Sequence, residues 1–455
     1  MPDSVPMPLS AGQEGLWLTH QLDPDSPAYN VVLAVRLRDP VRTDVLQEAL
    51  TALVRRHELL RSRFPATEQG PERVTVPAQA VRLDVREVPE ADDDGLFLLA
   101  GRAGEEPFRL AGEGAFRAVL LRRAPDDAVL VTATHHLVSD ATSQWLLVRD
   151  LFAEYGARTA GGPGRPAAPS DGGTWDEQVR TEREFVTSPR GARAAAYWRQ
   201  VCAGLAAAAL PTDRPRPAQR TLNGATVELA LPDRTAARLR GVAAQRALTP
   251  FAWLLGTFQA ALHRSGAGDG FLIGCPVTTR FTPRSREAVG YYVNALPVAG
   301  RFGPATTLLE TVEAAQRQLR GGLAHARHPV ELIKGPADRG PLFRISCTLV
   351  AADRLPVPGL YEGPVRLGGL RAELCDVPQQ EGQLDLTVEV LQDSRGFRAV
   401  LRYNTDLFDA ATVERFRDTW HRLIDASLDA PGTRAADIGL VADDDLRFLL
   451  SLGGA

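Results

Sequence analysis

The stretch Thr134-His135-His136-Leu137-Val138-Ser139-Asp140-Ala141 joins a run of apolar and β-branched residues, 128–134 (AVLVTAT), to an amphipathic segment, 140–155. The first run predicts a short buried strand, and the second predicts a helix that begins at the aspartate. Because neighbouring side chains of a strand point to opposite faces, His135 and His136 cannot share one cleft unless the strand ends between them. We therefore expect one histidine to be structural and the other functional.

The residue types in this stretch suit acid–base chemistry, because histidine is the usual positioned acid or base near neutral pH. Asp140 stands where a carboxylate caps a helix or pairs with a cation, and the amides of Ala141 and Thr142 could stabilise a developing anion. Two plainer interpretations stay open: packed, hydrogen-bonded histidines and an aspartate that only caps its helix. A metal site is not indicated, because the spacing gives neither histidine a second ligand on its face.

Composition excludes several classes of function. A net charge of -4 gives no electrostatic case for a nucleic-acid partner. The N-terminus lacks the features of a signal peptide, and no apolar run approaches the ~18–20 residues of a membrane span, so we expect a cytoplasmic protein without a membrane partner. No phosphate loop, dinucleotide-binding glycine motif or nucleophile elbow is present. The separated cysteines predict buried thiols rather than disulfides or a zinc site: Cys202, Cys275, Cys347 and Cys375.

The length of 455 residues predicts two domains or subdomains, because one hydrophobic core rarely serves so long a chain. A Gly- and Pro-rich segment, 156–173, predicts a linker and divides the chain into halves 1–175 and 176–455. Strand-like and helix-like segments occur in both halves, which predicts an α/β chain with mixed sheets. The expected strands are 29–37, 128–134, 270–277, 343–350, 384–390 and 397–403, and the expected helices are 44–61, 140–155, 306–326 and 410–427.

The stretch from His135 to Asp140 resembles the His-His-x-x-x-Asp-Gly motif of condensation domains of nonribosomal peptide synthesis. Further elements similar to those of this family follow its order and spacing, so the resemblance covers about residues 8 to 445. These elements are 9–17 (LSAGQEGLW), 56–64 (RHELLRSRF), 210–217 (LPTDRPRP), 273–280 (IGCPVTTR), 289–294 (VGYYVN) and 403–408 (YNTDLF).

The resemblance implies two chloramphenicol-acetyltransferase-like subdomains that form a V-shaped pseudo-dimer around a central tunnel. His136 is then the catalytic residue at the middle of the tunnel. We expect Asp140 to pair with Arg280 across the halves, since an arginine closes the family's Gly-x-Pro-Val-x-x-Arg element. The residues that support the motif are His135, Asp140, Ala141 and Arg280, and the expected tunnel residues are Ser139, Tyr292 and Asn294.

The reaction implied by the resemblance is transfer of an acyl or peptidyl group from a donor carrier protein to an amine or hydroxyl, which gives an amide or an ester. The acceptor comes from a second carrier protein or is a free amine or alcohol. Thioester aminolysis runs downhill, so we expect no bound cofactor; the phosphopantetheine arm of the partner presents the substrate. We expect a monomer, because the fold is already a pseudo-dimer.

Some positions depart from the family pattern. Ala141 replaces the glycine of the motif, and two later family elements are reduced to 327–331 and 337–343. We expect the extra methyl group of Ala141 to narrow the channel or shift specificity, whereas the two reduced elements concern donor or acceptor preference more than the reaction itself. His57 and Glu58 lie among arginines on an expected amphipathic helix, which favours a structural role for both.

Two other functions stay open. An acyltransferase with a diffusible donor such as an acyl-CoA would use the same histidine, but plant-type enzymes of that kind carry an Asp-Phe-Gly-Trp-Gly element that this chain lacks. A non-catalytic docking module of the same fold tends to lose the second histidine, which is present here as His136.

Overall fold

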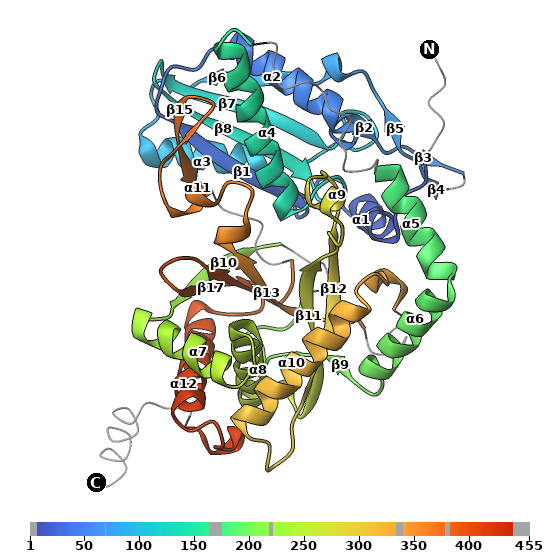
Figure 1. The fold of residues 1–455 in the computed structure, drawn as a ribbon, viewed down its shortest axis with the longest axis vertical. Helices are drawn as coiled ribbons and strands as arrows, with labels where there is room; N and C mark the ends of the chain where they lie inside the picture. The colour runs from blue at the N-terminus through green and yellow to red at the C-terminus, as the bar shows by residue number, and fades with distance from the viewer. Residues whose placement is uncertain are drawn as a thin grey trace.

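The computed structural model describes residues 7–68, 70–162, 175–217, 222–333, 340–377 and 383–439. These residues form two lobes, each built on one mixed β-sheet with helices packed against it (Figure 1). The mixed sheets predicted from the sequence are therefore confirmed.

The first lobe is built on a six-stranded sheet in the order β14-β15-β1-β8-β7-β6. The pair β6–β7 is parallel, and the other neighbours are antiparallel. Every residue of β8 is buried, as expected for a central strand with both faces covered. The strands are β1 (Asn30–Leu37), β6 (Leu83–Glu87), β7 (Phe116–Ala124), β8 (Asp127–His135), β14 (Val365–Leu367) and β15 (Leu370–Cys375).

Helices cover both faces of the first sheet. On β7, Leu120 packs in the cluster formed with α2 (Thr43–Arg56) and α4 (Ala141–Thr159), whereas Val119 packs with α3 (Asp93–Glu105) on the opposite face. This alternation is the period-two pattern of a strand that lies between two helical layers.

The second lobe is built on a seven-stranded sheet in the order β10-β17-β16-β13-β11-β12, with β9 paired to β11. Strand β13 runs parallel to both β11 and β16, so this sheet is also mixed. The strands are β9 (Ala206–Ala207), β10 (Gly224–Ala230), β11 (Gly270–Thr278), β12 (Val293–Arg301), β13 (Ile345–Ala351), β16 (Leu386–Gln392) and β17 (Phe397–Asn404).

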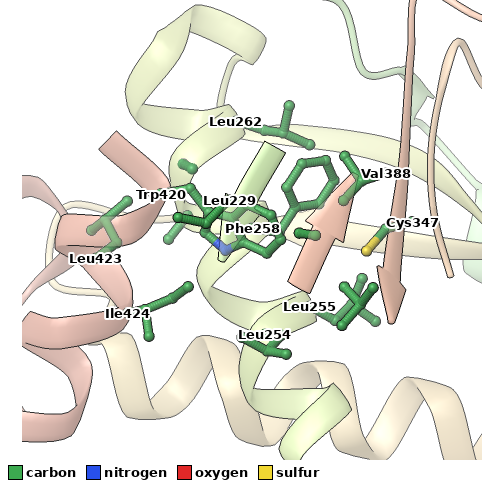
Figure 2. Packing of buried hydrophobic residues seen from close by; sticks show 14 of the residues in the cluster. Leu229, Leu254, Leu255, Phe258, Leu262, Cys347, Val388, Trp420, Leu423 and Ile424 are labelled. Atoms are coloured by element: carbon green, nitrogen blue, oxygen red, sulfur yellow. The ribbon is translucent and has the colours of Figure 1, made fainter. Parts of the chain in front are cut away.

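The largest hydrophobic core fills the space between this sheet and its helices. Figure 2 shows Phe258 of α8 beside Trp420 of α12, and their rings meet edge to face at 5.3 Å. Helix α8 is buried over nearly its whole surface, which explains why its sequence is apolar all round. The helices of this layer are α7 (Asp233–Gln245), α8 (Pro250–Leu262), α10 (Leu308–Ala324) and α12 (Ala410–Asp429).

The remaining elements lie outside the two main sheets. The capping box of Ser10 and Gln13 starts α1. The remaining helices are α1 (Ala11–Leu22), α5 (Trp175–Thr187), α6 (Pro189–Cys202), α9 (Pro283–Arg286) and α11 (Pro358–Glu362), and the short strand pairs are β2 (Ser62–Arg63) with β5 (Val74–Thr75) and β3 (Ala66–Thr67) with β4 (Gly70–Pro71).

The predicted halves 1–175 and 176–455 do not coincide with the two sheets. Strands β14 and β15 come from the second half of the sequence, yet β15 pairs with β1 and so extends the first sheet. Figure 1 shows this segment in orange against the first lobe. The crossing was not predicted, because strand pairing between residues so far apart in the chain leaves no local pattern. Most of the predicted linker, 163–173, lies outside the described residues.

The helix predicted to continue to residue 61 ends at Arg56. His57 adopts an extended backbone, with φ -113° and ψ 93°, and a 3₁₀ turn follows at Glu58–Arg61. This backbone buries the His57 imidazole, with Nε2 3.5 Å from a carboxylate oxygen of Asp150 on α4. A structural role for His57 agrees with this position.

The chain's four cysteines are buried free thiols, as predicted. In the part of the chain that the structure describes, no helix is both long and apolar enough to cross a membrane.

A buried charge network ties α2 to α4. Nη2 of Arg56 donates to Oε1 of Glu154 at 2.7 Å, and Arg158 also pairs with Glu154. The Glu154 side chain is only 1% exposed, so its charge depends on these arginines for compensation. The network fixes the helix that directly follows the His-His motif.

We expect Glu154→Gln to lower the free energy of unfolding by about 1.5–3 kcal/mol, because it removes a charged partner of Arg158 and one of the two carboxylates that pair with Arg56. Urea denaturation checks this value. The matched control is Glu87→Gln, which removes the partner of Arg122 at an exposed pair and should change the unfolding midpoint little. Equal midpoints for the two variants would contradict a stabilising role for the network.

Candidate active site

The strand that carries the motif ends between its two histidines. His135 is the last residue of β8, and the backbone N–H of His136 donates to the carbonyl of Tyr29 at 2.6 Å. The chain then turns and enters α4 at Ala141. Because the strand has ended, the alternation of side chains no longer decides how the two imidazoles lie. They lie in different surroundings because His135 packs against His20 and Phe108, whereas His136 packs against Tyr291.

His135 is the structural member of the pair. Its ring is buried against His20 and Phe108, with centroids 5.5 Å and 6.5 Å away, and its Nδ1 accepts a hydrogen bond from the Leu137 N–H at 3.1 Å. Burial and the neighbouring histidines lower the pKa of His135 to about 3, so the ring stays neutral. Within the described ranges, no group of three His, Cys, Asp or Glu side chains is arranged to hold a metal ion.

His136 has the geometry of a general base. Its Nδ1 lies 2.7 Å from the carbonyl oxygen of Ser139. Because a carbonyl oxygen only accepts hydrogen bonds, Nδ1 must carry the proton and Nε2 must keep a free lone pair. Burial lowers the pKa of His136 below 6.5, although the Ser139 carbonyl and Asp140 oppose this shift. The half-buried ring is therefore neutral, and its basic nitrogen is Nε2.

Asp140 joins the two lobes through the predicted pair with Arg280. Its Oδ1 accepts from Nη2 of Arg280 at 2.8 Å and from the Ser143 N–H at 2.7 Å, and Oδ2 accepts from the Tyr292 N–H at 3.2 Å. Each side chain of the ion pair is only 4% exposed. Asp140 is therefore a helix cap and an ion-pair partner at the same time.

Both lobes hold the guanidinium of Arg280. Its Nη1 donates to the carbonyls of Ser285 and Ala288, and its guanidinium lies 4.4 Å from the centre of the Tyr292 ring. Nη2 also donates to Oγ of Ser143 at 2.8 Å. Several charge-assisted hydrogen bonds thus fix the loop of His136 relative to the second lobe.

Ser139 and Ala141 do not have the positions expected for tunnel and motif residues. The Ser139 side chain is fully buried, and its Oγ lies 2.5 Å from Oγ1 of Thr134; only its backbone carbonyl serves His136. Ala141 is exposed at the first helical position of α4 and does not line the cavity described below. The expectation that its methyl group narrows the channel gains no support there.

A cavity of about 250 Å³ is lined by residues of α1, α5 and the second lobe, and His136, the expected centre of the tunnel, is not among them. Asn294 and Tyr292 both line it, but each is also structural. The Asn294 side chain donates to the carbonyls of Ala326 and His328, both at 2.8 Å, and thereby braces the loop after α10. Tyr292 is buried beneath Arg280, so neither side chain is free to follow a substrate.

Sequence reasoning missed Tyr291, which links this cavity to His136. Tyr291 lines the cavity, and its ring lies edge-on to the His136 imidazole, with centroids 5.2 Å apart. Two adjacent tyrosines precede β12, and only one can face the histidine. The sequence does not say which of the two does so, because the answer depends on where the strand begins.

Comparison with known proteins gives the family. A family model of the condensation domain matches residues 5–450. The chain belongs to this family. It is 31% identical to phosphinothricin tripeptide synthetase PhsC of Streptomyces viridochromogenes, over 98% of the chain and 41% of the relative. It is 32% identical to the probable non-canonical nonribosomal peptide synthetase CymA of Salinispora arenicola, over 100% of the chain and 6% of the relative.

Solved structures show the same fold. The X-domain from teicoplanin biosynthesis has a TM-score of 0.86 at 24% identity and covers 97% of this chain and 99% of its own. The starter condensation domain of rhizomide synthetase RzmA has a TM-score of 0.78 at 22% identity and covers 96% of this chain and 100% of its own. The predicted pair of chloramphenicol-acetyltransferase-like lobes is thereby confirmed.

We expect Asp140→Ala to destabilise this condensation domain by about 3–5 kcal/mol, because Arg280 then stays buried without its partner. Thermal and urea unfolding measure the loss. The double variant Asp140→Ala/Arg280→Ala should recover part of it, since neither charge is then left alone. If the Asp140→Ala protein unfolded at the same temperature as the wild type, this result would contradict the structural role of Asp140.

Nitrogen NMR of His136, assigned by comparison with His136→Ala, should show a neutral ring at pH 7 with its proton on Nδ1. The reason is the hydrogen bond to the Ser139 carbonyl. Because burial lowers the pKa of His136, the ring should gain its second proton only below its ordinary value of 6.5. A proton on Nε2 at neutral pH would contradict the base assignment.

Proposed function

We propose that this condensation domain transfers an acyl or peptidyl group from the phosphopantetheine thioester of a carrier protein to an amine or hydroxyl acceptor, with His136 as its catalytic residue. The observation that carries this proposal is the neutral imidazole whose Nδ1 is held by the Ser139 carbonyl and whose Nε2 is free. Membership of the condensation family and relatives named as peptide synthetases support it.

The proposed step forms one bond and breaks another. The acceptor nitrogen attacks the thioester carbon, and Nε2 of His136 removes the proton that the nitrogen must lose. Collapse of the tetrahedral intermediate breaks the C–S bond, and the proton passes from the imidazolium to the departing thiolate. No ATP is consumed, because the energy of the thioester drives the reaction. An alcohol is a weaker nucleophile than an amine, so ester formation would depend more strongly on the base.

The partners and the carrier arm are part of the same proposal. This chain spans less than half of PhsC and a small part of CymA, so donor and acceptor partners are not fixed by the likeness. The phosphopantetheine arm belongs to a carrier protein and brings the substrate to His136. We propose a donor carrier protein and an acceptor that is carrier-bound or free.

Docking without catalysis is the second candidate. The observation in its favour is the fold likeness to the teicoplanin X-domain, which a second structure contains in complex with OxyB. The hydrogen-bonded His136 favours the enzyme, because a docking surface has no need of an imidazole with a fixed proton.

The test mixes the purified chain with an acyl-loaded carrier protein and with amine or alcohol acceptors. Mass spectrometry follows loss of the thioester and gain of product. We expect His136→Ala to slow product formation by ~10²–10⁴-fold, the usual contribution of a general base. The better acceptor decides between amide and ester.

His421→Ala is the matched control, because this histidine lies on α12 beside Asp425 in the second lobe. It should react like the wild type. Equal rates for His136→Ala and the wild type would contradict the mechanism. If the wild type and both variants bind the carrier protein but none of them forms product, the docking function would be favoured.

A further inference from the structure

The interface between β8 and α4 changes from apolar to polar as it approaches His136. Leu130 of β8 and Leu147 of α4 belong to one buried hydrophobic cluster. The next positions on the same faces carry a hydroxyl and an amide, Thr132 on β8 and Gln144 one turn earlier on α4. Both of these side chains are buried. Burying polar groups costs free energy unless they are hydrogen-bonded, so simple packing does not account for this change.

Gln144 is the centre of a buried hydrogen-bond network. Its Nε2 donates to the carbonyl of Val31 on β1 at 2.9 Å and to Oγ1 of Thr134 at 2.5 Å. Its Oε1 accepts from the hydroxyl of Thr132 at 3.2 Å. Because the carbonyl of Val31 can only accept, the amide nitrogen must face β1, and the orientation of the amide is fixed. Both amide hydrogens and the amide oxygen therefore have partners.

The network ends at the residue that holds His136. Oγ1 of Thr134 lies 2.5 Å from Oγ of Ser139, and the carbonyl oxygen of Ser139 lies 2.7 Å from Nδ1 of His136. The backbone N–H of Ser139 donates to the carbonyl of His136 only at 3.4 Å, which is long for a hydrogen bond of this kind. The Ser139 side chain is fully buried. Its hydroxyl is therefore a firmer anchor for this residue than the backbone of the turn.

We propose that Gln144 is a positioning residue for the reaction: through Thr134 and Ser139 it orients the carbonyl that keeps the proton of His136 on Nδ1. This inference rests on the proposed function, because it takes Nε2 of His136 as the reacting base. The hydrogen bond made by one ring nitrogen of a histidine decides which nitrogen carries the proton. Without the amide, the hydroxyls of Thr134 and Ser139 lose the donor that sets their direction, and the Ser139 peptide can turn away from Nδ1.

The test follows the proton of His136 by nitrogen NMR in the full chain, with no substrate present. Gln144→Met keeps an unbranched side chain of similar length but removes the amide. We expect the form protonated on Nε2 to rise ~2–10-fold relative to the form protonated on Nδ1, the change that loss of one ordinary hydrogen bond gives. In the acyl-transfer assay, kcat should fall while the KM for the acceptor stays the same, because Gln144 does not line the cavity.

Ser139→Ala tests whether Gln144 acts through Ser139. It removes the hydroxyl at the end of the network and leaves the amide of Gln144 with its bonds to Val31 and Thr134. It should change the ratio of the two protonated forms as much as Gln144→Met does. The double variant should change it no further, because both substitutions interrupt the same chain of hydrogen bonds. If Gln144→Met gives no folded protein, Ser139→Ala decides: a changed ratio supports the inference, and an unchanged ratio overturns it.

Gln316→Met is the matched control, because Gln316 is a buried glutamine of α10 in the second lobe whose Oε1 accepts from the Thr249 N–H at 2.8 Å. It also loses a buried hydrogen bond, yet it should keep the wild-type ratio. A wild-type ratio in folded Gln144→Met, or an equal change in Gln316→Met, would overturn the inference. A ratio that depends on Gln144 in a chain that forms no product would uphold the positioning role and reject the proposed function; product formation with an unchanged ratio would do the reverse.

Discussion

The ion pair between Asp140 and Arg280 is the constraint on which the site depends. It joins the helix cap of α4 in one lobe to a loop of the other, and both side chains are almost fully buried. Burying two charges is costly unless the geometry is good, and here further hydrogen bonds from Ser143 and Tyr292 satisfy the carboxylate. Ser139, whose carbonyl sets the proton of His136, directly precedes Asp140. The orientation of the imidazole therefore depends on the contact between the lobes.

Two contributions to the rate can be compared in free energy: the orientation of the bound reactants and the action of a general base. Orienting two bound reactants is worth ~7–11 kcal/mol, whereas a general base gives ~10²–10⁴-fold, or about 3–5 kcal/mol. An amine is already a good nucleophile for a thioester, so in the proposed reaction the greater part of the rate would come from holding both substrates at one point. The two lobes meet at that point, and a change in their relative position would cost more than a small change in the pKa of His136.

The sequence predicted the catalytic stretch well because its signals are local. The apolar run before His135 and the helix after Asp140 need only neighbouring residues to be recognised, and the Asp140–Arg280 pair followed from a family resemblance. Asn294 and Ser139 were expected in the tunnel from the family resemblance; Asn294 does line the cavity, but backbone carbonyls hold its side chain, and the Ser139 side chain is buried against Thr134. Tyr291 was missed because the direction in which its side chain points depends on where β12 begins. Strands β14 and β15 join the first sheet through pairing with residues far away in the sequence, which the periodicity of a segment does not reveal.

Fold likeness alone cannot separate the two proposed functions. The teicoplanin X-domain and the four-domain synthetase AB3403 each superpose on this chain with a TM-score of 0.86. Function must therefore be argued from the site rather than from the lobes. His136 has a fixed proton on Nδ1, and its ring lies edge-on to Tyr291. Such a ring suits the proposed reaction, because a nitrogen that attacks a thioester carbon must lose a proton, and Nε2 is the nitrogen that can accept it.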